Sequence, residues 1–284
     1  MDTVPIDSVL LASRPVHRMG FGAMQLPGPG VFGPPRNREQ ALSVLRRAVD
    51  AGVNHIDTAQ FYGPNVANEL IHEALYPYPE DLVLVSKVGA ARDEQGRWLP
   101  AQHPEQLRAG VEANLASLEL NQVPVVNLRR HPDSDVPFVE QLEAMMAMRD
   151  EGLIAGIGLS NVDVADYHLA RSRTQVACVQ NAFNLADRSG QDLFDTCRAD
   201  EVPFVPFFPL GSAFNPENPV LRAASVEETA RRLNVTPAQV ALAWLLHLAP
   251  NVLLIPGTSS LDHLEENLAA VDVAFDQEAI DVLS

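Results

Sequence analysis

The chain is 284 residues long and 46% hydrophobic, which is enough apolar sequence to bury the core of one barrel-sized domain, and we expect a single domain over residues 1–284. Its formal net charge of −17, from 20 Lys and Arg against 37 Asp and Glu, predicts an acidic surface that repels nucleic-acid phosphates and anionic lipids. Nucleic acids and membranes are therefore not expected as partners.

Short runs rich in Val, Ile and Leu alternate with longer stretches of helical periodicity, which is the pattern of βα units around a parallel sheet. The runs predicted as strands are residues 18–26, 54–59, 82–88, 124–129, 154–160, 177–183, 203–208 and 251–256. Eight such units favour a closed (β/α)8 TIM barrel over an open Rossmann sheet, because no GxGxxG motif follows the first strand. A short hairpin within residues 4–18 is expected to plug the N-terminal end of the barrel.

Two of the helical runs carry clear end signals. Residues 37–52 have one apolar face and a C-terminal stop at Gly52. Residues 236–250 begin with a Thr cap and a Pro at the first helical position, and they close at a second Pro. The Gly- and Pro-rich segments 26–35 and 214–219 predict loops rather than linkers between domains.

The sequence shows no targeting segment and no metal-ligand spacing. Residues 1–20 lack a basic start followed by a long apolar run, and no stretch reaches the roughly 18 apolar residues of a membrane span, so we expect a cytoplasmic protein. Cys178 and Cys197 lack CxxC spacing and are expected to be reduced, with Cys178 in the core. The histidines lack an HExxH pattern, so no metal site is predicted.

Polar side chains occupy the ends of two predicted strands, where barrel enzymes keep their functional groups. Asp57 lies near the end of strand 54–59 with Tyr62 in the following loop, and Lys87 lies near the end of strand 82–88. A buried Asp or Lys alone costs several kcal/mol, whereas the two compensate each other, so a structural ion pair is one interpretation. The other is catalytic: a buried ammonium favours a neighbouring phenolate, so we expect a lowered pKa for Tyr62 and a role as general acid–base.

These segments resemble motifs of the aldo-keto reductases along nearly the whole chain. "NHIDTAQFYG" is similar to the signature that carries an Asp and a Tyr of a catalytic tetrad, and "VSKVG" is similar to the lysine segment. The resemblance implies catalytic roles for Asp57, Tyr62 and Lys87. It also implies NADPH-dependent reduction of an aldehyde or another carbonyl to the alcohol, with Tyr62 as proton donor.

A nearer resemblance is to bacterial members described as pyridoxal reductases. The words in common are "FYGP", "EALYPY" and "VNLR". This resemblance implies a pyridoxal-like aldehyde as the small-molecule substrate.

The resemblance further implies a nicotinamide-binding set. "GLSN" corresponds to a Ser–Asn pair that hydrogen-bonds the carboxamide, "VPFFPLG" to a segment whose aromatic residue stacks under the ring, and "IPGTSSLDHLEENLAA" to the part that holds the 2′-phosphate and adenine. The implied cofactor-binding residues are Gly22, Met24, Asp57, Ser160, Asn161, Gln180, Phe207, Pro209, Leu210, Gly211, Gly257, Thr258, Ser259, His263, Glu266 and Asn267.

The fourth tetrad position departs from the family pattern. Members usually have a histidine at the end of the fourth strand, and the register here places Arg129 at that position with His131 two residues beyond. Arg129 is preferred because it belongs to the common word "VNLR", but His131 would face the same way if the strand continued. A guanidinium there would polarise the carbonyl and could pair with a phenolate or carboxylate on the substrate. For both residues, a solvated strand end is the alternative.

The cofactor loop departs as well. Many members carry a Lys and an Arg that clamp the 2′-phosphate, and the corresponding positions here are Gly257 and His263. Hydroxyl groups near a helix start remain as anion donors, so NADPH is the expected cofactor, with NADH possible at a weaker preference.

An open substrate pocket is expected because the chain stops at Ser284, without the long C-terminal loop of many relatives. Phe61 and Trp98 are expected to line this pocket, with Trp98 on a long loop over residues 89–103.

Two other functions are compatible with the same residues. One is a broad carbonyl or quinone reductase, and the other is a nicotinamide-binding regulatory subunit with little turnover. The sequence predicts no particular oligomeric state.

Overall fold

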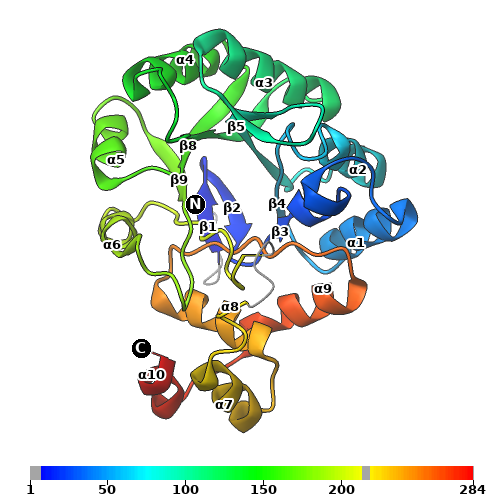
Figure 1. Cartoon of the computed structure of the whole chain (residues 1–284), viewed down its shortest axis with the longest axis vertical. Coiled ribbons are helices and arrows are strands. Elements are labelled where there is room, and N and C mark those ends of the chain that lie inside the picture. Colours follow the sequence, from blue (N-terminus) through cyan, green and yellow to red (C-terminus); the bar gives the residue numbers. More distant parts are fainter. Residues whose placement is uncertain (1–7, 213–217, 284) are drawn as a thin grey trace.

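The computed structural model describes residues 8–212 and 218–283, and helices surround a central ring of parallel strands (Figure 1). Six strands pair side by side in the sheet in chain order. They are β3 (Phe21–Gly22), β4 (His55–Asp57), β5 (Val83–Arg92), β7 (Val123–Arg129), β8 (Ile154–Ser160) and β9 (Val176–Gln180).

The last two predicted strands, 203–208 and 251–256, complete the ring through isolated bridges rather than as regular strands. Phe204 bridges both Val179 of β9 and Val252, and Leu254 bridges Met19 beside β3. The prediction of regular strands there was wrong in detail, because residues 203–208 contain prolines that cannot donate to a sheet ladder. The predicted barrel fold is confirmed.

The interior of the barrel is an apolar core that the N-terminal hairpin closes. Strands β1 (Ser8–Leu11) and β2 (Arg14–His17) pair antiparallel and lie inside the ring of elements in Figure 1. Leu11 and Val16 pack in one cluster with side chains of the barrel strands, including the predicted core residue Cys178. The hairpin prediction is confirmed for the described residues, and positions 4–7 lie outside them.

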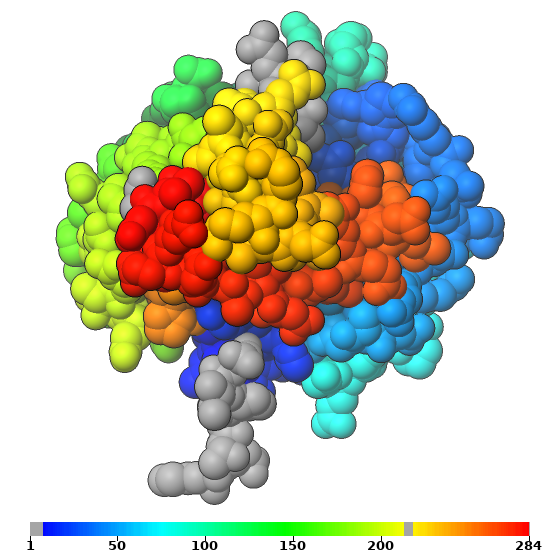
Figure 2. Space-filling view, turned by 90° about the horizontal axis from the view of Figure 1, so that it is seen from below, coloured from blue at the N-terminus to red at the C-terminus, as the bar shows by residue number. Residues whose placement is uncertain are grey.

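The helices cover the outside of the barrel and bury two further apolar clusters against it. They are α1 (Arg38–Asp50), α2 (Val66–Leu75), α3 (Pro104–Ser117), α4 (Phe138–Asp150), α5 (Val164–Arg171), α6 (Gln191–Ala199), α7 (Ala224–Leu233), α8 (Pro237–Leu248), α9 (Leu261–Leu268) and α10 (Gln277–Leu283). Figure 2 shows α7, α9 and α10 together on one flank. In the described parts of the chain, no helix is long and apolar enough to cross a membrane.

Residues 89–103, expected as a loop, form a β-hairpin instead. Strand β5 continues to Arg92 and pairs antiparallel with β6 (Trp98–Ala101). The connecting turn explains the difference, because the Asp93 side chain accepts backbone hydrogen bonds and Gly96 adopts a φ of +74°. The hairpin places Trp98 beside the mouth of the barrel.

Candidate active site

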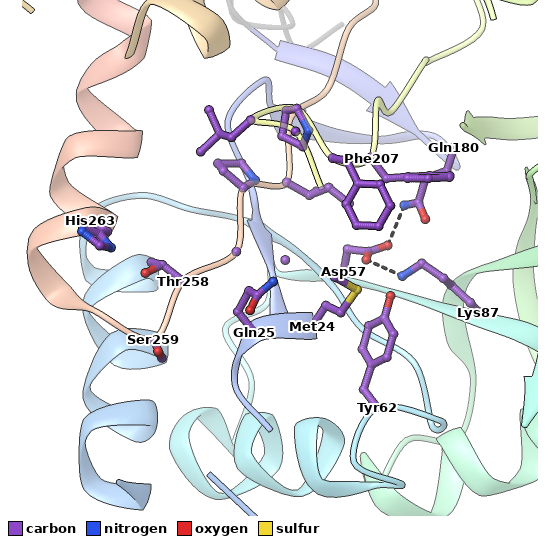
Figure 3. Close-up of a pocket in the computed structure, with 18 of the residues that line it drawn as sticks. Met24, Gln25, Asp57, Tyr62, Lys87, Gln180, Phe207, Thr258, Ser259 and His263 are labelled. Carbon is purple, nitrogen blue, oxygen red and sulfur yellow. Dashed lines mark hydrogen bonds and ion pairs between the residues drawn. The ribbon is translucent and has the colours of Figure 1, made fainter. Parts of the chain in front are cut away.

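A cavity of about 580 Å³ opens at the carboxyl-terminal ends of the barrel strands (Figure 3). The predicted catalytic and substrate-lining residues that face it are Asp57, Phe61, Tyr62, Lys87, Trp98 and Arg129. The predicted cofactor residues that face it are Gly22, Met24, Asp57, Gln180, Phe207, Pro209, Leu210, Gly211, Gly257, Thr258, Ser259 and His263. The structure therefore gathers at one place residues that lie far apart in the sequence.

Strand alternation brings the charged groups to this mouth. Side chains two residues apart lie on one face of a strand. Val83 and Val85 of β5 belong to the inner core, so Lys87 follows them inward, and Val125 of β7 leads in the same way to Arg129. Two neighbouring strands thus each deliver a cation to the same cavity.

The Asp57 and Lys87 side chains form a buried ion pair. Lys87 Nζ binds Asp57 Oδ1 and donates to the Thr58 carbonyl oxygen at 3.0 Å, and Gln180 Nε2 donates to Asp57 Oδ2 at 2.8 Å (Figure 3). Burial alone would lower the pKa of Lys87, but the opposing charge of Asp57 and the nearby Tyr62 raise it above its usual range. Lys87 therefore stays protonated, as both the structural and the catalytic interpretations require.

Tyr62 is buried beside this pair. Its N–H donates to the Ala59 carbonyl oxygen at 3.0 Å, and Lys87 Nζ lies 4.9 Å from the centroid of its ring. Burial, with a smaller contribution from the Asp57 charge, raises the pKa of Tyr62 despite the lowering by Lys87 and Arg129. The predicted net lowering was wrong, because the burial that brings the ammonium close also removes water from the phenolate. At neutral pH Tyr62 keeps its proton, which is the state a proton donor needs.

Arg129 ends β7 and points into the cavity. Its guanidinium carbon lies 5.5 Å from the centroid of the Phe207 ring, and Nη1 donates to Ser160 Oγ at 3.4 Å. Burial lowers the pKa of Arg129, and the nearby Tyr62 partly offsets this effect. Within the described residues, no carboxylate forms an ion pair with Arg129.

His131 lies outside this cavity. β7 ends at Arg129, and the chain then turns, with the Ser134 N–H donating to the His131 carbonyl oxygen at 3.1 Å. His131 instead lines a second hollow with Arg130. The strand stops before the alternation could carry His131 inward, so the geometry favours Arg129 at the fourth tetrad position.

The predicted Ser160–Asn161 pair does not face the cavity either. Ser160 points inward but is fully buried beneath Arg129. Asn161 has a φ of 59°, donates to the Arg130 carbonyl oxygen at 3.1 Å and lines the second hollow. Of the predicted cofactor residues Ser160, Asn161 and Gln180, only Gln180 faces the cavity.

The predicted 2′-phosphate region forms the other end of the cavity. Thr258, Ser259 and His263 lie together there in Figure 3, around the start of α9. Ser260 caps this helix, as its Oγ accepts from the His263 N–H at 3.4 Å. The cavity is not lined by Glu266 or Asn267, which lie further along α9. Asn267 is buried.

Two glycines allow the backbone at the end of β3 to approach the backbone of residues 255–257 closely. A Cβ atom at Gly22 would lie 2.4 Å from the Ile255 carbonyl oxygen, and one at Gly257 would lie 2.3 Å from the Gly22 carbonyl oxygen. Any larger side chain would push the two segments apart. The two segments therefore meet along the cavity wall only because both positions are glycine.

Aromatic side chains form the rim. The rings of Phe61 and Trp98 meet edge to face at 5.6 Å, and the Arg92 guanidinium carbon lies 4.1 Å from the centroid of the Trp98 ring. Trp98 is 40% exposed and lines the cavity, so part of its side chain remains available to a ligand.

Several lining residues were not predicted from the sequence. Those not expected are Gln25, Asn218, Leu221, Ile255 and Pro256. Ile255 and Pro256 fall in a predicted strand end and could have been found by position, whereas nothing in the sequence signals the loop residues. In the two described ranges, no cluster of three His, Cys, Asp or Glu side chains could hold a metal ion.

Comparisons with known proteins identify the family of this chain. The model of the aldo/keto reductase family matches residues 18–284. Pyridoxine 4-dehydrogenase of Escherichia coli (strain K12) is 47% identical over 278 residues, which cover 96% of each chain. An uncharacterised oxidoreductase of Schizosaccharomyces pombe is 37% identical over 279 residues, which cover 98% of this chain and 89% of the relative.

Solved structures show the same likeness. An aldo/keto reductase from Klebsiella pneumoniae, in complex with NADP and acetate, superposes with a TM-score of 0.82 at 27% identity and covers 98% of this chain and 94% of its own. The family match and the close relatives both extend over nearly all of the sequence. This chain therefore belongs to the aldo/keto reductase family.

Proposed function

We propose that this aldo/keto reductase uses NADPH to reduce a pyridoxal-like aldehyde to its alcohol, with Tyr62 as the proton donor. The observation that carries the proposal is the convergence of Tyr62, the Asp57–Lys87 pair and Arg129 on one cavity. The pyridoxine 4-dehydrogenase of Escherichia coli, 47% identical, supports the choice of substrate class.

The cavity has the chemistry that a nicotinamide dinucleotide needs. The Phe207 ring gives a flat wall next to Asp57 and Lys87, and hydroxyl groups at the start of α9 offer donors to a phosphate at the other end (Figure 3). The expected nicotinamide contacts are Gln180 and Phe207, and the expected phosphate contacts are Thr258, Ser259 and His263. When bound, the cofactor supplies the hydride that no side chain can supply.

Each side chain of the tetrad has a separate task. Tyr62 Oη gives its proton to the carbonyl oxygen as negative charge develops there. Lys87, held by Asp57, then stabilises the phenolate of Tyr62. The Arg129 guanidinium donates hydrogen bonds to the carbonyl oxygen of the substrate. Burial disfavours the phenolate of Tyr62, and the Lys87 ammonium offsets part of this effect.

Replacing Tyr62 with Phe tests the proposal. We expect Tyr62→Phe to lose most of the turnover of pyridoxal, about 100-fold or more, because the proton donor is gone. NADPH binding, measured by calorimetry, should stay within about twofold of the wild type. Near-normal turnover in the variant would remove Tyr62 from this role.

A substrate panel separates the proposed function from its alternatives. Loss of NADPH absorbance would be followed with pyridoxal, simple aldehydes and quinones. The highest kcat/KM is expected for pyridoxal. Faster reduction of quinones would favour a broad carbonyl reductase, which the exposed rim around Trp98 permits. Tight NADPH binding without turnover of any carbonyl would favour a regulatory subunit.

A further inference from the structure

The ionisable side chains of the cavity leave one charge uncompensated near the reacting end. Besides Tyr62, those facing it are Asp57, Lys87, Arg129 and His263. Asp57 and Lys87 neutralise each other, and His263 lies at the opposite end in Figure 3. In the described part of the chain, Arg129 is therefore the cation that remains next to Tyr62.

Arg129 has no carboxylate partner among the described residues, although it lies in a strongly acidic chain. The acidic residues of the chain outnumber its basic residues by 37 to 20, and the neighbouring Arg130 is paired with Asp166. Arg129 is half-buried, and its guanidinium contacts Ser160 Oγ at 3.4 Å and the Phe207 ring. A guanidinium has five N–H donors, so most of them remain available to a ligand in the cavity.

The walls around Arg129 suit a flat ring. Phe61 and Trp98 line the cavity together with Tyr62, and aromatic side chains stack well on a planar ligand. A flat aromatic aldehyde held between them would carry its substituents toward Arg129.

We propose, on the basis of the proposed function, that Arg129 selects aromatic aldehydes that carry an ionised oxygen on the ring carbon next to the one bearing the carbonyl. In such compounds, rotation about the bond between the ring and the carbonyl carbon can bring the two oxygens to the same side. The planar guanidinium fork binds paired oxygens through two parallel hydrogen bonds, as it binds a carboxylate. Arg129 thereby recognises the ionised oxygen and orients the carbonyl oxygen toward Tyr62.

Recognition can be measured without any reaction. The probes are 4-deoxypyridoxine, which keeps the ring hydroxyl but has no carbonyl, and its 3-O-methyl ether, titrated by calorimetry into the protein loaded with NADP+. The wild type should bind the hydroxyl compound about tenfold more tightly or better, because a hydrogen bond to a charged group is lost in the ether. In Arg129→Gln the two affinities should lie within about twofold of each other.

Two further variants keep the test falsifiable. Arg129→Lys retains the charge but not the fork, and it should give an intermediate preference even if Arg129→Gln does not fold. Arg130→Gln is the matched control, because Arg130 lies outside the cavity, and it should keep the full preference. The inference is overturned if the wild type binds both probes equally or if both Arg129 variants keep the wild-type preference.

Turnover separates this inference from the proposed function. At an alkaline pH where salicylaldehyde is ionised, it differs from 2-methoxybenzaldehyde only at the neighbouring oxygen, and the ratio of their kcat/KM values should fall in Arg129→Gln. If no aldehyde is reduced at all, the reductase proposal fails while the binding comparison still decides what Arg129 recognises.

Discussion

At the scale of single residues, burial sets the chemistry of the site more than any one charge does. The Lys87 ammonium favours the phenolate of Tyr62, yet burial raises the pKa of Tyr62 overall. The sequence could predict the neighbours but not the net direction of the shift, because the depth of burial depends on the whole fold. The same burial makes the ion pair important for stability.

The ion pair can be separated into its structural and catalytic parts. Lys87→Met should lower the free energy of unfolding by about 3–5 kcal/mol, because it leaves the Asp57 carboxylate buried without a partner. Combining it with Asp57→Asn should restore most of that stability, since no charge then remains unpaired. Urea unfolding measures the free energy of unfolding of the single and the double variant. Neither variant should regain turnover, and a fully active double variant would show that the pair is only structural.

His55 begins β4, at the end of the strand opposite the cavity, and we expect it to make the fold sensitive to acid. Burial, together with the charge of His17, lowers the pKa of His55 from 6.5 to about 4. Between pH 6.5 and about 4, His55 binds a proton in the unfolded chain but not in the folded chain. The free energy of unfolding should therefore fall as the pH drops through this range. The loss from this group is about 3 kcal/mol and is absent above pH 6.5.

Replacing His55 with Leu checks this assignment. The variant should show a smaller decrease in the free energy of unfolding between neutral pH and pH 4, measured by urea titrations at a series of pH values. His168→Gln is the control, because His168 is exposed on α5. An unchanged pH dependence in His55→Leu would assign the acid sensitivity to other groups.

At the scale of elements, strand alternation made much of the site predictable. The inward parity of β5 and β7 carries Lys87 and Arg129 to the mouth, and both positions could be counted from the sequence. The sequence could not show where β7 ends, and its end at Arg129 keeps His131 out of the cavity. The β5–β6 hairpin was missed for a related reason, since its short turn depends on local hydrogen bonds of Asp93.

The hairpin gives a prediction about the substrate. Arg92 connects the β5–β6 hairpin to the loop before α1, because it donates to the Gly30 and Val31 carbonyl oxygens, both at 2.9 Å. The same guanidinium stacks on the Trp98 ring. Trp98→Ala should raise the KM for pyridoxal about tenfold with a smaller change in kcat, because an aromatic wall is lost and the catalytic groups stay in place. Steady-state kinetics measure this split.

Leu99 provides the matched control for Trp98. It is the next residue of β6 and is equally exposed, at 40%, but it does not face the cavity. Leu99→Ala should leave the KM near that of the wild type. Equal effects of the two substitutions would mean that Trp98 only stabilises the hairpin.

At the scale of the whole molecule, the barrel itself was predictable because its eight βα units follow one another in order. The prolines of residues 203–208 signal a weak strand there, but the bridges of Phe204 and Leu254 could not be predicted, since they join residues far apart in the sequence. The net charge is also a property of the whole chain. A field from −17 charges opposes any anionic cofactor, so local groups must offset that repulsion.

His263 is the basic side chain at the expected 2′-phosphate end of the described cavity, and it tests how local charge competes with the overall field. His263→Arg places a permanent cation with a planar fork there, so NADPH affinity should rise about tenfold while NADH affinity changes little. His168→Arg makes the same change on the exposed surface of α5 and should raise either affinity only slightly, because solvent and salt screen a distant charge. Calorimetric titration of each cofactor gives the ratio, and an equal gain for NADH in His263→Arg would place the 2′-phosphate away from α9.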